Sequence, residues 1–390
     1  MTVGIKTPVC SDTGGCFVRR LKNVYFNQVL HIMIPFASER KKTRQITVGS
    51  VKVGGAAPVA VQSMTNTLTQ DVAATVAQIR RLEEAGCEIV RVAVPDRDAA
   101  TAIGAIRRDI RIPLIADIHF DYRLALAAAE AGADGLRINP GNIGSMRKVR
   151  AVVDCARDRG LPIRIGVNAG SLEKEILEKY NGATPEGMVE SALGHVKILE
   201  SLSFHEIKIS IKASDVGRTL AAYRLLSEKT DYPLHVGVTE AGGLYPGIVK
   251  SALGIGMLLA GGIGDTLRVS LTRDPVEEVR VGYEILRALG LRQRGPEIIS
   301  CPTCGRCRIP LFDIAEQVEK ALLTCPHPVK VAIMGCVVNG PGEAREADIG
   351  IAGGDGVGIL FKKGEVVKKF PQEKLVAVLL EEVEKIGVTG

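Results

Sequence analysis

Residues 162–168 read PIRIGVN, and this stretch decides the fold. Successive side chains of a β-strand point to opposite faces, so Ile163, Ile165 and Val167 share one face while Arg164 and Asn168 share the other. The same alternation recurs along the chain with an amphipathic helical pattern in every gap. It predicts strands over residues 59–65, 88–94, 113–119, 135–140, 162–168, 206–212, 233–239 and 265–271.

Eight consecutive strand–helix units are the number expected of a (β/α)8 TIM barrel, which we assign to residues 41–290. A doubly wound open sheet is the alternative, and the absence of a GxGxxG turn disfavours it. Ahead of the first unit, Ile46–Val48 and Val51–Val53 flank a Gly-Ser turn and predict a β-hairpin.

The pattern changes after residue 290. We expect a linker at 291–300 and then a small α+β domain at 301–390, with a helix at 312–323, strands at 329–335, 348–352 and 356–362, and a last helix at 372–386. Residues 1–40 lack sustained periodicity and a clean cleavage site. They are interpreted as a poorly ordered extension without an assigned role, not as a secretory signal.

Composition narrows the class of protein. The chain has 390 residues, 46% apolar and 24% charged, and no window of 18 uninterrupted apolar positions, which disfavours disorder and a membrane span. The net charge is +6 without a Lys/Arg-rich block, and Trp is absent, so nucleic acid is not an expected partner. Five of nine cysteines fall between residues 301 and 336, which indicates a metal or redox centre in a reducing compartment, the cytoplasm.

The strand faces opposite the apolar ones carry an unusual charge. They hold six cations and one acid, Asp117, for a net +5: the cations are Arg91, Arg137, Arg164, Lys208, Lys212 and Arg268. Uncompensated charges in a barrel interior are costly, and guanidinium groups bind phosphate oxygens bidentately, so we expect a phosphorylated ligand. Alternatively, single cations pair with acids on loops or reach the bottom rim, Lys208 above all. Glu240 ends the seventh strand, where a desolvated carboxyl group can carry a proton.

The cysteine-rich segment predicts a metal centre. Residues 301–307 read CPTCGRC, and Cys336 is followed by an Asn-Gly-Pro-Gly turn and by Glu343. Cys325 could complete a four-ligand zinc site, whereas three thiolates and a carboxylate suit an iron–sulfur cluster with one exchangeable position. The lone third cysteine favours the cluster over zinc, which remains an alternative.

These segments together resemble the 4-hydroxy-3-methylbut-2-enyl diphosphate synthases of the non-mevalonate isoprenoid pathway, over nearly everything after about residue 42. The matching segments are VQSMTNT (61–67), VRVAVPD (90–96), ADIHFD (116–121), LRINPGNIG (136–144), RIGVNAGSLE (164–173), SIKASD (210–215), GVTEAG (237–242), LRVSLT (267–272), ISCPTCGR (299–306) and GCVVNGPGE (335–343). The resemblance implies reductive opening of 2-C-methyl-D-erythritol 2,4-cyclodiphosphate, with loss of a hydroxyl group as water and two electrons delivered through a [4Fe–4S] cluster.

The resemblance also implies roles for individual residues. Glu240 would donate a proton, with Thr239 beside it, and Asn339 would orient the substrate oxygen next to the cluster. The implied cluster ligands are Cys301, Cys304, Cys336 and Glu343, and the implied diphosphate-binding residues are Arg91, His119, Arg137, Arg164, Asn168, Lys212, Arg268 and Ser270.

Two features depart from the family pattern. Cys307 has no ligand role there, so we expect a free thiol, and residues 1–40 have no counterpart. The family further implies a head-to-tail homodimer, in which the cluster domain closes over the partner's barrel, and flavodoxin or ferredoxin as the electron donor. The competing hypotheses are a phosphate-binding barrel with a structural zinc ribbon as an interaction module, and a non-redox barrel lyase or synthase.

Overall fold

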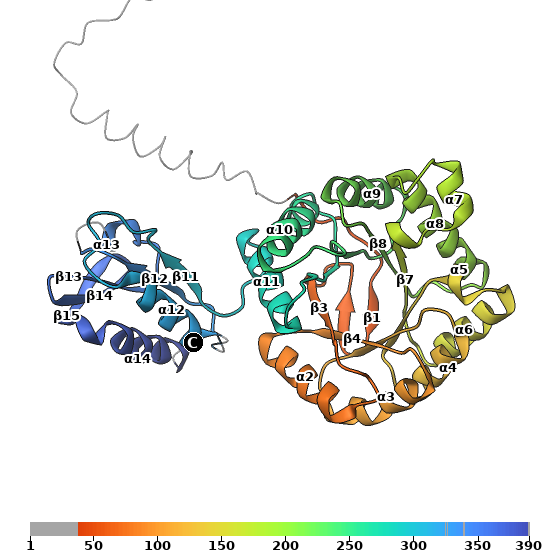
Figure 1. Cartoon of the computed structure of the whole chain (residues 1–390), viewed down its shortest axis with the longest axis horizontal. Helices are drawn as coiled ribbons and strands as arrows, with labels where there is room; N and C mark the ends of the chain where they lie inside the picture. The colour runs from red at the N-terminus through yellow and green to blue at the C-terminus, as the bar shows by residue number, and fades with distance from the viewer. Residues whose placement is uncertain (1–37, 324, 326, 338–339, 389–390) are drawn as a thin grey trace, which may run out of the picture.

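A computed structural model of the chain describes residues 38–388 apart from 324, 326, 338 and 339. The expected extension at 1–40 therefore lies mostly outside the described residues. A barrel and a smaller C-terminal domain follow one another along the chain (Figure 1). In the part of the chain that is described, no helix is long and apolar enough to cross a membrane.

The eight predicted barrel strands are all present and all parallel, in the order β8-β7-β6-β5-β4-β3-β10-β9. An isolated parallel bridge between Ile209 and Leu234 joins β8 to the chain that enters β9, so the sheet closes on itself. The TIM barrel is confirmed and the open sheet is not. The strands are β3 (Ala60–Met64), β4 (Ile89–Ala93), β5 (Leu114–Asp117), β6 (Gly135–Ile138), β7 (Ile163–Asn168), β8 (Ile207–Lys212), β9 (His235–Val236) and β10 (Thr266–Leu267).

Helices form an outer ring around these strands (Figure 1). Aspartates start several of them: Asp71, Asp96 and Asp215 each accept a hydrogen bond from a backbone N–H of the first turn. The ring helices are α2 (Val72–Ala85), α3 (Arg97–Asp109), α4 (Tyr122–Glu130), α6 (Met146–Asp158), α8 (Pro185–Ser201), α9 (Val216–Lys229), α10 (Leu244–Ala260) and α11 (Pro275–Ala288). Shorter elements in the loops are α5 (Pro140–Ile143), η1 (Ala169–Ser171) and α7 (Lys174–Lys179).

The core lies between the strands and this ring. Ile163, Ile165 and Val167 of β7 are fully buried in it, as the alternation in residues 162–168 predicts. Because the helices bury the side chains on one face of each strand, the side chains on the other face line the barrel interior.

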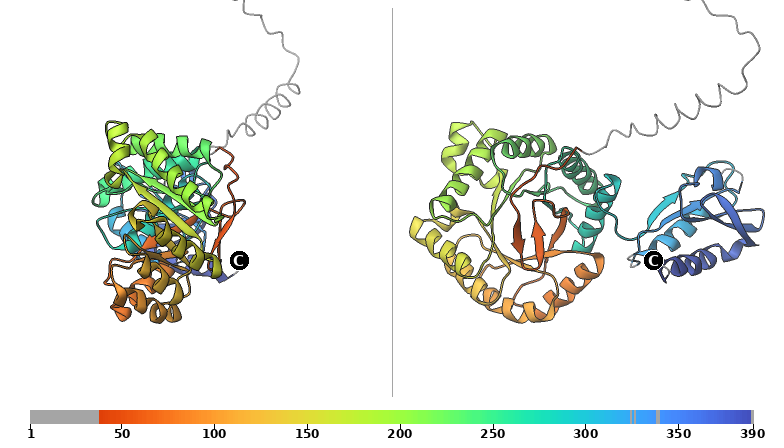
Figure 2. Two further views of the ribbon diagram at one scale, coloured as in Figure 1. Left: turned by 90° about the vertical axis from the view of Figure 1, so that its right-hand side faces the viewer. Right: turned by 180° about the vertical axis from the view of Figure 1, so that it is seen from behind.

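The predicted hairpin is β1 (Ile46–Val48) paired with β2 (Val51–Val53). Its apolar side chains pack against Ala60, Ile89 and Ile115, which lie at or near the N-terminal ends of β3, β4 and β5. In Figure 1 and in the right-hand view of Figure 2, the hairpin lies across the centre of the barrel. The hairpin therefore closes the N-terminal end of the barrel, and a ligand reaches the interior from the C-terminal ends of the strands.

The C-terminal domain has a five-stranded mixed sheet in the order β11-β12-β13-β14-β15. Its strands are β11 (Glu297–Ser300), β12 (Lys330–Met334), β13 (Ile349–Gly354), β14 (Val357–Lys362) and β15 (Glu365–Pro371). Helices α12 (Leu311–Leu322) and α14 (Leu375–Val388) share a core with Val331 and Ile333 of β12. Ala332 and Met334 point to the other face, near α13 (Gly340–Glu343), and η2 (Gln372–Lys374) leads into α14.

Two strands of this domain escaped prediction. The expected linker at 291–300 is wrong in its second half, because Glu297–Ser300 forms β11 and pairs with β12. Ile298 packs into the core on one face of the sheet and Ile299 into the core on the other face. A strand of four residues with one apolar side chain on each face shows no alternating pattern in the sequence. β15 is mostly exposed and rich in Lys and Val, which removes the apolar signal on which the prediction depended.

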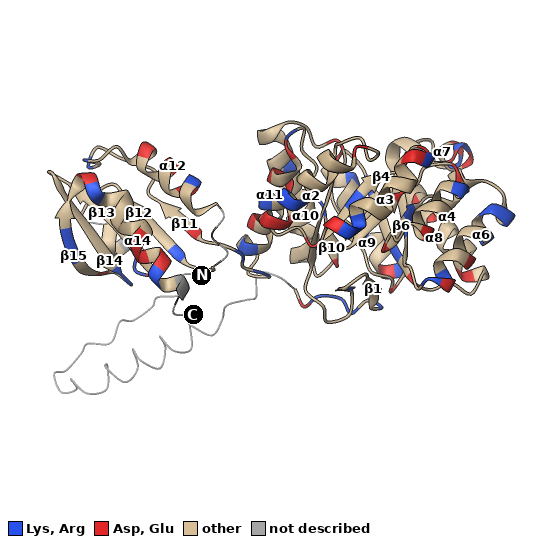
Figure 3. Ribbon diagram, turned by 90° about the horizontal axis from the view of Figure 1, so that it is seen from below, with Lys and Arg blue, Asp and Glu red and all other residues tan. Residues whose placement is uncertain are grey.

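The charged surface fits the modest net charge. Lys and Arg positions are interspersed with Asp and Glu positions over the barrel helices and the C-terminal domain (Figure 3). Surface pairs such as Lys179–Glu190 and Arg157–Asp154 are examples. The concentration of like charge lies inside the barrel.

Candidate active site

The six cations that the alternation predicts face one lumen. Five are buried and the sixth, which follows β10, is partly exposed: Arg91, Arg137, Arg164, Lys208 and Lys212, then Arg268. In the strand register Arg137 lies beside Arg164, and Arg164 lies beside Lys208. Side chains that are far apart in sequence therefore form one cationic column inside the barrel.

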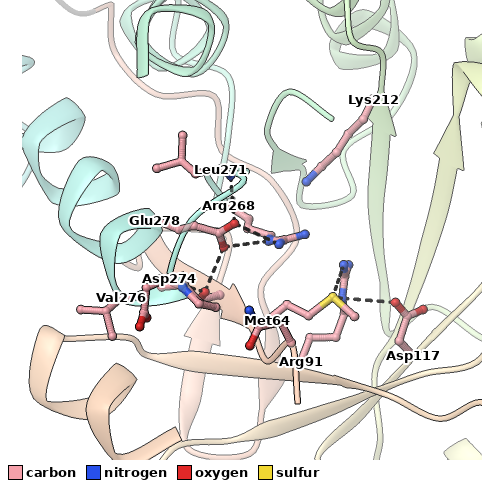
Figure 4. Close-up of polar contacts among 12 residues, drawn as sticks. Met64, Arg91, Asp117, Lys212, Arg268, Leu271, Asp274, Val276 and Glu278 are labelled. Carbon is pink, nitrogen blue, oxygen red and sulfur yellow. Dashed lines mark hydrogen bonds and ion pairs between the residues drawn. The ribbon is translucent and has the colours of Figure 1, made fainter. Parts of the chain in front are cut away.

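Asp117, at the end of β5, compensates two of these arginines. Its carboxylate lies 3.3 Å from Arg91 Nε (Figure 4). It also accepts a 2.9 Å hydrogen bond from Arg137 Nη1. Burial raises the pKa of Asp117, but the two guanidinium groups outweigh burial and lower its pKa to about 2. Arg91 also donates to Met64 Sδ, 2.9 Å from Nη2. Because a guanidinium group has five N–H donors, both arginines are held in place with donors left for a ligand.

A second internal acid, Glu278 of α11, was not predicted from the sequence. It is only 3% exposed and lies 3.2 Å from Arg268 Nη2 (Figure 4). The +5 predicted for the strand positions thus has one further compensating acid, which a helix contributes and not a strand. A signal was available, because Glu278 stands on the apolar face of its helix, one turn before Gly282 and two before Ile285.

Three buried cations, Arg164, Lys208 and Lys212, have no acid within ion-pair distance among the described residues. Among the described residues Nε and Nη1 of Arg164 have no hydrogen-bond partner, and Lys212 Nζ lies 3.2 Å from Nε2 of His235. Burial lowers the pKa of Arg164 and that of Lys212 well below their ordinary values, and neighbouring arginines lower both further. An anion in the lumen would supply the missing negative charge and hydrogen-bond acceptors.

Lys208 is the second residue of β8 and lies at the level of Arg164 on β7. It is 1% exposed, and its Nζ has no hydrogen-bond partner among the described residues. Burial, with a smaller contribution from Arg164, lowers the pKa of Lys208 to about 7. The side chain of Lys208 is buried, and the acid that favours its charged form is Asp265, which directly precedes β10.

The pKa of Lys208 predicts how stability varies with pH. Between about pH 7 and 10.5 the unfolded chain binds a proton that the folded chain does not, so the free energy of unfolding rises with pH across this range. We expect Lys208→Met to remove that rise and to stabilise the fold by about 1 to 4 kcal/mol at pH 7. Urea unfolding at pH 7 and pH 10 measures both effects. A less stable variant at pH 7 would mean that Lys208 has a favourable partner in the folded protein.

The remaining predicted residues lie at the open rim. His119 follows β5 with a 56% exposed side chain, and its Nε2 is 3.8 Å from Asp117. Asn168 ends β7 and, like Thr239 and Ser270, is half-buried. Glu240 is exposed and adopts a left-handed backbone with φ 52°. The expected desolvation of Glu240 is therefore absent in the chain by itself, because no other element covers this loop.

The predicted cluster ligands lie at one edge of the C-terminal sheet. Cys301 follows β11 and Cys336 follows β12, and these strands are parallel neighbours, so both thiols leave the sheet at the same edge. Thr303 has φ 67°, the left-handed turn that carries the chain from Cys301 to Cys304. None of the described cysteines is in a disulfide. Asn339 lies outside the described residues, as does the side chain of Glu343.

These thiols do not form a preformed metal site. Within the described residues, no group of three His, Cys, Asp or Glu side chains is close enough to hold a metal ion. The side chain of Cys307 is directed into the C-terminal domain. Its Sγ is 3.4 Å from the carbonyl oxygen of Ile309 and packs against the core shared by α12, α14 and β12. Two further cysteines belong to the barrel: Cys87 is buried and Cys155 packs half-buried against the barrel core.

Comparisons with known proteins cover both parts of the chain. Residues 43–283 match the GcpE TIM-barrel domain and residues 297–385 match the GcpE protein C-terminal domain. Among solved structures, dihydropteroate synthase from Yersinia pestis is similar at 13% identity and a TM-score of 0.45, over 63% of this chain and 98% of that one.

Curated relatives match over almost their whole length. The 4-hydroxy-3-methylbut-2-en-1-yl diphosphate synthase (flavodoxin) of Geobacter sulfurreducens is 65% identical over 347 residues, 89% of this chain and 98% of that protein. Proteins of the same name from Caldanaerobacter subterraneus and Clostridium perfringens are each 61% identical, over 89% of this chain and 98% and 99% of theirs. The resemblance drawn from the motifs is thus confirmed, and the chain belongs to the GcpE family of 4-hydroxy-3-methylbut-2-en-1-yl diphosphate synthases.

Proposed function

We propose that the barrel lumen binds 2-C-methyl-D-erythritol 2,4-cyclodiphosphate and that the C-terminal domain brings a [4Fe–4S] cluster to it. The reaction is that of the family, conversion of this cyclodiphosphate to 4-hydroxy-3-methylbut-2-enyl diphosphate. It takes up two electrons and two protons, opens the ring at a carbon–oxygen bond and releases one hydroxyl group as water. The observation that carries the proposal is that two of the proposed substrate-binding cations, Arg164 and Lys212, are buried with no ion-paired acid among the described residues.

The lumen provides the donors that a cyclic diphosphate requires. Bidentate guanidinium–phosphate contacts fix both the position and the orientation of a ligand, and a dehydrated lumen strengthens them. Asp117 keeps Arg91 and Arg137 in place before the ligand arrives. The proposed substrate-binding residues are Arg91, His119, Arg137, Arg164, Asn168, Lys212, Arg268 and Ser270.

The donor set of the C-terminal domain fits an iron–sulfur cluster. Thiolates at the ends of two neighbouring parallel strands, with a further thiol one turn away, are the usual means of holding such a cluster. When bound, the cluster supplies electrons and a Lewis-acidic iron. We assign the ligands to Cys301, Cys304, Cys336 and Glu343, and we propose that Asn339, three residues after Cys336 in the sequence, orients the substrate oxygen next to the cluster.

Glu240 is the proposed proton donor for the departing hydroxyl group, with Thr239 beside it. Its exposure at the barrel rim means that it is desolvated only when another domain covers the rim. We expect Glu240→Gln to bind the cyclodiphosphate within a fewfold of the parent but to lower kcat by about 100-fold or more, since an amide cannot donate that proton. Steady-state kinetics and equilibrium binding separate the two effects. Unchanged kcat would exclude Glu240 as the donor.

The electron donor is proposed to be flavodoxin and not ferredoxin. The name of each relative described above includes flavodoxin, and two such relatives are more than 60% identical to this chain. Free cysteine thiols such as Cys301 and Cys336 require a reducing compartment, so we place the enzyme in the cytoplasm.

A homodimer is proposed because α10 presents an apolar row outward. Tyr245, Val249, Leu253 and Met257 recur at every fourth residue and are between 46% and 79% exposed. Such a row packs well against a second copy of itself, since interdigitated i, i+4 ridges are the commonest helix–helix contact. We expect Leu253→Glu to shift the protein from dimer to monomer in sedimentation equilibrium. A variant that stays dimeric would move the interface elsewhere.

The experiment that tests the proposal combines metal analysis with an assay. Anaerobically purified protein is expected to contain about four iron and four sulfide per chain and to be brown. It should reduce the cyclodiphosphate when supplied with reduced flavodoxin. Zinc alone under these conditions, or turnover that survives loss of all three cluster thiols, would overturn the assignment of the cluster.

A further inference from the structure

The carboxylate of Glu278 has four donors around it, which is unusual for one acid on a barrel helix. Oε1 accepts from Arg268 Nη2 at 3.2 Å and from the backbone N–H of Leu271 at 3.0 Å. Oε2 accepts from Arg268 Nε at 3.3 Å and from the Ser63 hydroxyl at 3.1 Å. The neighbouring acid Glu277 instead pairs with Arg280 on its own helix, half-exposed to solvent. Glu278 is thus directed inward, and Figure 4 shows its contacts with Arg268 and Leu271.

These contacts hold the guanidinium group of Arg268 in one orientation, which its partial burial alone would not do. The side chain of Arg268 is 19% exposed, the largest value among the arginines of the lumen that face an acid. An arginine in that position loses rotamer entropy when it binds a ligand. A carboxylate that takes both Nε and Nη2 sets the plane of the group before binding, and Nη1 remains for the ligand.

The same carboxylate holds the chain that carries Ser270. β10 is only two residues long, Thr266–Leu267, and the backbone that follows it is held by separate bonds, from Arg268 N–H to the Val236 carbonyl oxygen and from Thr272 N–H to the Gly242 carbonyl oxygen, each 3.0 Å. The bonds from Ser63 on β3 and from the Leu271 backbone to Glu278 tie this segment to its neighbouring strand. Glu278 therefore supports the segment of Ser270 between the backbone bonds of Arg268 and Thr272, and it binds the Arg268 guanidinium group as well.

We propose that Glu278 is a positioning residue, which orients Arg268 and the segment of Ser270 for a phosphate group of the substrate. This rests on the proposed role of Arg268 in substrate binding. The barrel then has two internal carboxylates with the same role, since Asp117 orients Arg91 and Arg137 while Glu278 orients Arg268.

Charge and position predict opposite results for Glu278→Gln, which makes the proposal testable. If Glu278 acted only as a negative charge near an anion site, its removal would tighten anion binding. If it positions Arg268, the amide nitrogen of Gln would face guanidinium donors, the group would turn away and binding would weaken. We expect the dissociation constant of the cyclodiphosphate to rise about 10- to 100-fold.

The experiment is a double-mutant cycle by calorimetry on the anaerobically purified holoenzyme, with Glu278→Gln, Arg268→Ala and the double variant. Since Glu278 acts through Arg268, its substitution should have little further effect on binding once Arg268 is absent. Glu277→Gln is the matched control, which removes a charge from the adjacent position of the same helix. It should leave the dissociation constant within about twofold.

Each outcome decides a separate point. Tighter or unchanged binding by Glu278→Gln, or additive effects in the cycle, would overturn the positioning role. No effect of Arg268→Ala would instead overturn the proposed role of Arg268 in the substrate site. If thermal unfolding shows that Glu278→Gln does not fold, Glu278→Asp takes its place, since it keeps the charge but is one methylene too short to hold both edges of the guanidinium group. It too should weaken binding.

Discussion

Replacing Cys301 by alanine is expected to abolish turnover and to lower the iron content of the anaerobically purified protein to a small fraction of about four per chain. Cys301 directly follows β11, and the bond from its backbone N–H to the carbonyl oxygen of Ile333 ties its position to β12. The thiol is half-buried, so its loss removes a ligand without opening a large cavity. Because the cofactor carries the redox chemistry, no other side chain replaces its contribution. Iron analysis and the reductive assay measure the two losses.

The matched control is Cys307→Ala in the same loop. Cys307 Sγ lies against the carbonyl oxygen of Ile309 and close to Gly335, where an added Cβ would be 2.7 Å from the sulfur. It therefore packs inside the domain, and its variant should retain iron and most of the activity. Loss of iron from Cys307→Ala with retention in Cys301→Ala would reverse the assignment of the two thiols.

The barrel was predictable because the alternation of apolar and polar residues along each strand matches the alternation of helix-facing and lumen-facing side chains. Along residues 162–168 each apolar side chain meets helices and each polar one meets the lumen, so a period of two in the sequence becomes two faces in the fold. β9 and β10 were also located, although their ladders contain only two residues each. Their apolar residues Val236, Leu267 and Val269 are fully buried whether or not the backbone pairs regularly.

The internal acids show where that reasoning stops. Strand parity found Asp117, since it lies on a strand, but it cannot find Glu278, because Glu278 lies on a helix and contacts Arg268 from there. The exposure of Glu240 has a similar origin: what covers a loop at the rim depends on other elements of the fold and not on its own sequence. Spacing likewise identified the thiols at 301, 304 and 336, whereas which of them point toward one another depends on strand order in the sheet.

Arg164 combines the highest expected cost to function with an expected gain in stability. Its side chain is buried, no acid lies beside it, and two of its nitrogens have no partner among the described residues. Burial and the nearby Arg91 lower its pKa well below the ordinary value, which means that the charged form is disfavoured in the free protein. The unbound barrel therefore carries an energetic cost at Arg164 that a bound anion relieves.

Arg164→Met should consequently act in opposite directions on folding and on binding. Met keeps the length and the apolar stem of the side chain but removes the unpaired charge, so we expect the free energy of unfolding to rise by about 1 to 4 kcal/mol. The same change should weaken cyclodiphosphate binding by about 100-fold or more, because a buried charge-assisted contact with phosphate is lost. Urea unfolding and calorimetry on one protein sample measure both.

The comparison with Arg123→Met makes that result interpretable. Arg123 lies exposed on α4 and pairs with Asp121 at 2.7 Å, outside the lumen, so its substitution should change stability by no more than about 0.5 kcal/mol and leave binding unchanged. Destabilisation by Arg164→Met would show that Arg164 already has a partner in the free protein, and retained affinity would show that the phosphate lies elsewhere. We expect a gain in stability together with a loss of binding only if the unpaired charge of Arg164 serves ligand binding and does not contribute to folding.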